Sequence, residues 1–193
     1  DHEVTLATHV YGPWLLTRAL LPRLRASADA RVVFVSSGGM YTQALPLDDL
    51  MFERGTYTGA LAYARAKRAQ VALVREWARR LRGQDVAVNA MHPGWADTPG
   101  LAASLPGFHR LIGGWLRSAA EGADTVLWLA AAPDARGITG RLLLDRRERP
   151  VSFQTMRPQR LAVGARKRLD EKERAAVGRG VGGNRALAGR RRV

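Results

Sequence analysis

Two short apolar runs on either side of a long helical segment constrain the fold of this chain most strongly. Residues 31–35 are β-branched and aromatic, and Val86–Met91 form a second run of this kind. Between them, residues 58–81 repeat apolar side chains at the spacing of one helical face. Strands joined through a helix are typical of a parallel sheet covered by helices. With a third short strand at residues 141–144, the chain is predicted to be an α/β protein with about three strands.

The segments around these strands also have predictable structures. Helices are expected at residues 6–24, 108–116 and 119–131, and a mostly irregular loop at 41–58. In the long helix the predicted inward stripe is Ala60, Tyr63, Lys67, Val71, Val74, Ala78 and Leu81. The opposite side carries Arg65, Arg68, Arg75, Arg79 and Arg82, which are most simply a solvated face rather than a nucleic-acid surface.

Tyr63 and Lys67 are the chemically most informative pair in the sequence. They are four residues apart in a helix, so their side chains lie on one face. An ammonium group close to a phenol favours the phenolate, which makes a proton donor and acceptor that works near neutral pH. A lysine at this position could instead extend its ammonium group to solvent at the edge of the stripe. Ser37, just after the first strand, could polarise a carbonyl group.

The composition excludes several other kinds of site. The 193 residues contain no cysteine, so there is no disulfide, thiolate metal site or cysteine nucleophile, and the four histidines lack metal-ligand spacing. No apolar run approaches the 18–20 residues or so of a membrane span, and a cytoplasmic location is expected. Of the net charge of +14, residues 157–193 contribute +9. This predicts a basic, disordered tail over 151–193, with nucleic-acid binding the less favoured alternative.

Three stretches, in order, resemble the short-chain dehydrogenase/reductase family. Residues 31–37 are similar to the strand that ends in the family's serine, and Tyr63-x-x-x-Lys67 matches its tyrosine–lysine pair. Residues 93–98, Pro-Gly-Trp-Ala-Asp-Thr, match its proline–glycine loop. The 26-residue step from Ser37 to Tyr63 is found in the retinol-dehydrogenase-like branch. The resemblance covers about residues 3–150.

The resemblance implies an oxidoreductase that uses NAD or NADP and a small carbonyl or alcohol substrate, without a metal. Ser37 would orient the carbonyl, Tyr63 would donate the proton, and Lys67 would hold the ribose hydroxyls of the cofactor. His9 falls at the position of the family's proton-relay asparagine. The implied catalytic residues are Ser37, Tyr63, Lys67 and His9, and the implied cofactor-binding residues are Tyr63, Lys67, Pro93, Gly94, Ala96 and Thr98.

The resemblance also implies that part of the family's fold is not in this chain. The expected structure is the C-terminal half of a Rossmann-like, doubly wound parallel sheet over residues 1–150, with the N-terminal nucleotide-binding half absent. The open sheet edge and the helices would then be available for a homodimer or another association. These residues alone are expected to be inactive.

The alternative is a non-catalytic remnant of the fold that acts as a binding or interaction module. Gly178–Gly183 imitate a dinucleotide fingerprint, but no strand precedes them. Ser37 lacks the G-x-S-x-G context of a serine hydrolase.

Overall fold

The computed structural model describes residues 3–104 and 106–152. These fall, apart from Ser152, within one compact unit, Asp1–Val151. The predicted tail, apart from residues 151 and 152, and the Gly178–Gly183 cluster lie outside the described residues.

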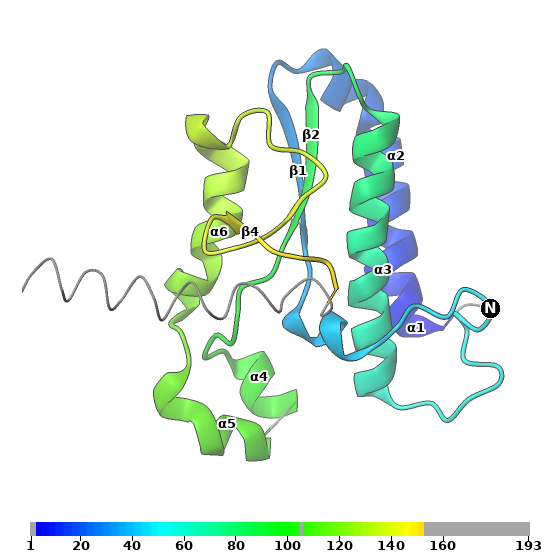
Figure 1. Ribbon diagram of the computed structural model, residues 1–193, viewed down its shortest axis with the longest axis vertical. Helices are drawn as coiled ribbons and strands as arrows, with labels where there is room; N and C mark the ends of the chain where they lie inside the picture. Colours follow the sequence, from blue (N-terminus) through cyan, green and yellow to red (C-terminus); the bar gives the residue numbers. More distant parts are fainter. Residues whose placement is uncertain (1–2, 105, 153–193) are drawn as a thin grey trace, which may run out of the picture. The chain divides into compact units, whose positions relative to one another are not determined.

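Helices and strands alternate along this unit (Figure 1). The chain begins with one helical stretch in three parts: α1 (Val4–Leu6), the π-helix η1 (Ala7–Tyr11) and α2 (Gly12–Ala26). The next elements are β1 (Ala30–Val35), the 3-10 helix η2 (Gly38–Thr42), α3 (Gly59–Arg80) and β2 (Val86–Met91). They are followed by α4 (Pro99–Ser104), α5 (Pro106–Ile112), η3 (Gly113–Trp115), α6 (Ala119–Ala131), η4 (Pro133–Ala135), β3 (Leu142–Leu144) and β4 (Arg147–Glu148).

The four strands form one sheet in the order β1-β2-β3-β4. β1 and β2 pair in parallel over their full length, from Ala30 opposite Val86 to Val35 opposite Met91. β3 is parallel to β2, whereas β4 turns back antiparallel to β3. The α/β fold is confirmed, but the predicted three strands are four. β4 was missed because its two residues are charged and exposed, so no apolar pattern marks it.

Helices cover both faces of this sheet. α2 and α3 lie on one face and α6 on the other (Figure 1). On the α2–α3 side, Val74 and Val88 are completely buried, and the rings of Trp14 and Trp77 lie 4.3 Å apart, centroid to centroid. On the α6 side, Met91, Leu129 and Leu143 form a second cluster. The sheet is therefore doubly wound, as a Rossmann-like fold requires.

The predicted faces of α3 are partly wrong, because the segment that follows β1 packs against this helix. Arg65 and Arg68 are half-buried rather than solvated. The Arg68 guanidinium donates to the carbonyl of Met40 at 3.4 Å, and that of Arg65 lies 4.4 Å from the ring centroid of Phe52. The prediction failed for these two arginines because η2 and the following loop pack on α3, which spacing along one helix cannot reveal. Ala60, predicted to face inward, is exposed at the start of the helix.

The helix predicted at residues 108–116 begins earlier and is broken into pieces. The Thr98 hydroxyl accepts from the Leu101 amide at 3.2 Å and caps α4. Pro106 begins α5, and the chain tightens into η3 at Gly113. The predicted helix therefore starts two residues early, at Pro106, whose fixed φ suits the first turn of a helix.

Two leucines of α6 give a matched test of this packing. Leu129 is 2% exposed in the cluster with Met91 and Leu143, whereas Leu127 on the same helix is 65% exposed. We expect Leu129→Ala to lower the free energy of unfolding by about 2–5 kcal/mol and Leu127→Ala to change it by less than about 0.5 kcal/mol. Urea denaturation measures both. Equal losses would contradict the placement of α6 on the sheet.

Candidate functional site

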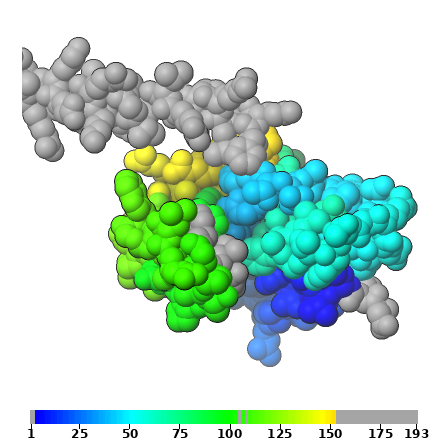
Figure 2. All heavy atoms as spheres, turned by 90° about the horizontal axis from the view of Figure 1, so that it is seen from below, coloured from blue at the N-terminus to red at the C-terminus, as the bar shows by residue number. Residues whose placement is uncertain are grey.

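The carboxyl ends of β1 and β2 bring the predicted site residues to one edge of the sheet. Val35 and Met91 are paired at the ends of these strands, and the Ser36 amide donates to the Met91 carbonyl at 2.7 Å. Ser37 and the Pro93-Gly94 turn therefore leave the sheet at the same edge, and α3 begins there (Figure 1). Figure 2 looks onto this edge and shows α4 and α5 (green) and the 43–58 loop (cyan) on opposite sides of it.

Lys67 joins α3 to the end of β1. Its Nζ donates to the Val35 carbonyl at 2.9 Å, and the Ser36 hydroxyl donates to the Lys67 carbonyl, also at 2.9 Å. The side chain is only 7% exposed, so the alternative of a solvent-extended lysine is wrong. Burial lowers the pKa of Lys67. This pair of hydrogen bonds fixes the ammonium group two residues from Ser37.

The Tyr63 ring is contacted by Lys67 and by His9. Lys67 Nζ lies 5.4 Å from the ring centroid, and the imidazole of His9 meets the ring edge-on at 5.5 Å between centroids. Tyr63 is 38% exposed. In the part of the chain that the structure describes, its hydroxyl has no hydrogen-bond partner. The phenol can therefore receive a partner from solvent.

His9 owes its position to the π-helix η1, in which the Gly12 amide donates to the Ala7 carbonyl. Such turns often occur at functional sites. Burial lowers the pKa of His9, and the positive charge of Lys67 lowers it further, while Glu3 raises it. Burial and the charge of Lys67, the two larger influences, both favour the uncharged imidazole beside Tyr63. The sequence contained no signal for the π-helix itself.

Ser37 lies at the start of η2, directly after β1. Its hydroxyl oxygen accepts from the Gly39 amide at 3.2 Å and caps this short helix. That bond uses the oxygen as an acceptor, so the hydroxyl hydrogen remains available to a substrate oxygen.

The proline–glycine loop packs against α6 and against the segment that precedes α6. Gly94 has φ +75°, and a Cβ there would lie 3.0 Å from Arg117 Nε. Only glycine fits this turn without strain. A Cβ on Gly122 would likewise meet the Ala96 Cβ at 3.0 Å, so α6 approaches the loop closely. Two backbone hydrogen bonds join the loop to Arg117. The Asp97 amide donates to the Arg117 carbonyl at 2.7 Å, and the Arg117 amide donates to the Trp95 carbonyl at 2.9 Å.

One ion pair and one histidine–carboxylate hydrogen bond that the sequence did not indicate lie beside this loop. The Arg117 guanidinium pairs with Asp145 in the turn between β3 and β4, and His109 Nε2 lies 2.8 Å from Asp97 Oδ1. Arg117 was missed because its partner is 28 residues away, on a hairpin too short to predict. The predicted site also leaves out His92, which directly precedes this loop.

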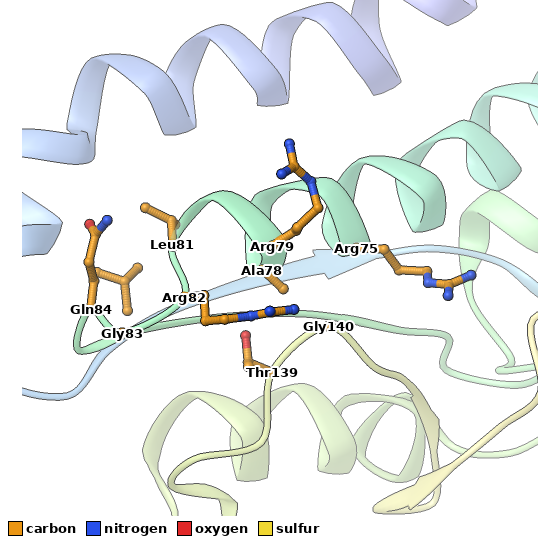
Figure 3. Close-up of a pocket in the computed structure, with 10 residues that line it drawn as sticks. Arg75, Ala78, Arg79, Leu81, Arg82, Gly83, Gln84, Thr139 and Gly140 are labelled. Carbon is orange, nitrogen blue, oxygen red and sulfur yellow. The ribbon is translucent and has the colours of Figure 1, made fainter.

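A groove of about 300 Å³ lies at the opposite end of β2 and is separate from this site (Figure 3). Figure 3 shows Arg75 and Arg82 on the side of α3 that faces Thr139 and Gly140, while Arg79 points away from them. Arg79 and Arg80 are paired with Glu76 at 2.8 and 2.6 Å, and their hydrogen bonds lower the pKa of Glu76 to about 2. The arginines do not converge on one point.

Residues 3–104 and 106–152 contain no group of three or more histidine or acidic side chains placed to hold a metal ion. None of their helices has both the length and the apolar character needed to cross a membrane.

Comparison with known proteins places this geometry in a family. A family model described as enoyl-(acyl carrier protein) reductase matches residues 1–144. Dehydrogenase/reductase SDR family member 12 of Bos taurus is 46% identical over 80% of this chain and 49% of its own length. Retinol dehydrogenase 14 of Mus musculus is 35% identical over 80% of this chain and 48% of its own.

Solved structures agree with the sequence comparison. A short-chain dehydrogenase from Escherichia coli CFT073, complexed with NADPH, superposes with a TM-score of 0.56 and 26% identity, over 72% of this chain and 50% of that one. The chain spans about half the length of the curated relatives it matches. From the family model, the relatives and the sheet edge with its Ser37, Tyr63 and Lys67, the chain belongs to the short-chain dehydrogenase/reductase family.

Proposed function

We propose that this protein is an NAD- or NADP-dependent oxidoreductase that moves hydride between a nicotinamide ring and a carbonyl or alcohol carbon. The observation that supports this best is the environment of Tyr63. Its phenol, which has no hydrogen-bond partner among the described residues, contacts a buried ammonium group and an imidazole at the edge that also carries Ser37. Such a constellation suits proton transfer to an oxygen atom while hydride reaches the adjacent carbon.

The protein residues supply orientation and the proton. In the reducing direction, the Ser37 hydroxyl donates to the substrate carbonyl oxygen and fixes it next to Tyr63. A nicotinamide held at this edge would supply the hydride for the carbonyl carbon, and the Tyr63 phenol gives its proton to the carbonyl oxygen. The charge of Lys67 stabilises the phenolate that remains.

The same edge fits the nicotinamide end of a cofactor. Lys67 uses one N–H on Val35, so its other donors can reach ribose hydroxyls. The Thr98 hydroxyl oxygen accepts from the Leu101 amide at the start of α4, so the hydroxyl hydrogen remains available to a cofactor oxygen. Pro93, Gly94 and Ala96 would hold the ring from the loop that α6 supports. The E. coli relative complexed with NADPH supports a cofactor of this class.

His9 completes the proposed proton path. When Tyr63 has lost its proton, the His9 imidazole beside the ring could return one through an intervening water, releasing a proton from one ring nitrogen while the other nitrogen takes one from solvent. We assign His9 this relay role in place of the family's asparagine.

Tyr63→Phe tests the proposed acid directly. We expect turnover of a reducible carbonyl by the full-length protein to fall about 10²–10⁴-fold, with cofactor affinity nearly unchanged, because only the phenolic proton is lost. Tyr57→Phe is the matched control, since Tyr57 is also half-exposed but hydrogen-bonds Glu3 outside the site. Steady-state kinetics measure both. Activity of Tyr63→Phe within about threefold of wild type would remove Tyr63 from the mechanism.

Lys67→Met should weaken cofactor binding about tenfold or more and move the activity optimum to higher pH, because a charged donor is lost. Since burial of the ammonium group already opposes its charge, the free energy of unfolding should fall less than in Leu129→Ala. Fluorescence titration with NADPH and a pH–rate profile provide the measurements. Normal affinity with an unchanged profile would show that Lys67 serves packing alone.

The 193 residues taken alone should bind the cofactor only weakly. We propose this because the resemblance assigns the family's glycine-rich phosphate loop to a segment before residue 3. Thermal melting of this chain with millimolar NADPH or NADH should show no clear shift. Binding at about 100 times the dissociation constant would instead add roughly 2.7 kcal/mol, a shift of several degrees. Such a shift would show that the nucleotide site is more complete than proposed.

A further inference from the structure

His92 is a buried histidine for which the proposed reaction has no use. It follows β2 directly and is 8% exposed. Its amide donates to the Leu143 carbonyl at 3.0 Å, so β3 fixes its backbone. Buried polar side chains usually have a hydrogen-bonding reason for their position.

The imidazole of His92 touches both loops that form the site. Its Nδ1 accepts from the Gly94 amide at 3.3 Å, in the turn where Gly94 has φ +75°. On the other side it faces the backbone at Gly38, where an added Cβ would come within 3.8 Å of both Cε1 and Nδ1. Gly38 is the residue after Ser37. One ring therefore spans the gap between the serine loop and the proline–glycine loop.

Tyr41, in η2, is the aromatic neighbour of the His92 imidazole. Its ring meets the imidazole edge-on at 6.3 Å between centroids, and its hydroxyl donates to the Pro150 carbonyl at 2.6 Å. The charged groups that face His92 are Arg149 after β4, Arg117 before α6 and Asp145 in the β3–β4 turn. Burial lowers the pKa of His92, both arginines lower it further, and Asp145 raises it.

We propose that His92 is the positioning residue that holds the Ser37 loop and the Gly94 turn in register, through a neutral imidazole that accepts at Nδ1. Acceptance at Nδ1 requires the tautomer with hydrogen on Nε2. A proton on Nδ1 would replace the acceptor by a donor facing the Gly94 amide, so acid breaks this link. The inference rests on the proposed function only for its effect on turnover.

Two substitutions separate the hydrogen bond from the filled volume. His92→Asn keeps an acceptor oxygen close to the place of Nδ1, whereas His92→Leu fills the space without one. In the full-length protein, hydrogen exchange of the Gly94 amide should rise about 5- to 10-fold in His92→Leu and stay near wild type in His92→Asn. His109→Asn, which removes a histidine that contacts the same loop through Asp97, should leave Gly94 exchange unchanged.

The pH dependence of exchange distinguishes this role from packing. After correction for intrinsic exchange, protection of Gly94 in the wild type should persist at the reference histidine pKa of about 6.5 and decrease at lower pH, because burial and the two arginines lower the pKa of His92. In His92→Asn it should not decrease. Equal protection at all pH values in both proteins, or equal exchange in the Leu and Asn variants, would overturn the proposal. If His92→Leu does not fold, the comparison of wild type with His92→Asn still decides it.

Turnover provides the second readout. A loop misplaced by about 1 Å can cost about 100-fold, so kcat should fall 10- to 100-fold in His92→Leu and be largely restored in His92→Asn. Absence of turnover in every protein, wild type included, would count against the oxidoreductase proposal, whereas the exchange of Gly94 would still test His92 by itself.

Discussion

The site depends on one buried contact, the hydrogen bond from Lys67 Nζ to the carbonyl of Val35. Placing an ammonium group away from water is costly unless it is paired or hydrogen-bonded. Here the acceptor is the last carbonyl of β1, and the Ser36 hydroxyl returns a bond to the Lys67 carbonyl. The helix that carries Tyr63 is thereby attached to the strand that presents Ser37. Without these two hydrogen bonds, the distance between Tyr63 and Ser37 would not be fixed.

The rest of the unit supports this attachment from two sides. The α2–α3 layer buries Val74 and Trp77 against the sheet, and the π-helix turns His9 toward the Tyr63 ring. On the other face, α6 approaches the proline–glycine loop so closely that Gly122 leaves no room for a Cβ. His92 accepts from the Gly94 amide and meets the Tyr41 ring of η2, and for that reason we assign it a positioning role rather than a chemical one.

Much of this arrangement could be predicted from the sequence, because its signals are local. The apolar runs defined β1 and β2, and the four-residue spacing placed Tyr63 and Lys67 on one helical face. Contacts between distant segments gave no such signal. The burial of Arg65 depends on where the 43–58 loop folds back, β4 has only two charged residues, and the π-turn at His9 follows no periodicity. Sequence patterns identify the residues of the site, whereas packing determines which atoms they meet.

The most direct test of the account follows the hydride itself. NADPH or NADH carrying deuterium at the transferable C4 position would be incubated with the full-length protein and an aldehyde or ketone. Mass spectrometry of the alcohol product would then locate the label. The account predicts one deuterium on the former carbonyl carbon, transferred stereospecifically, and its loss from that product in Tyr63→Phe. A protein that binds the cofactor but forms no labelled alcohol from any carbonyl tested would contradict it and would favour a binding role for this fold.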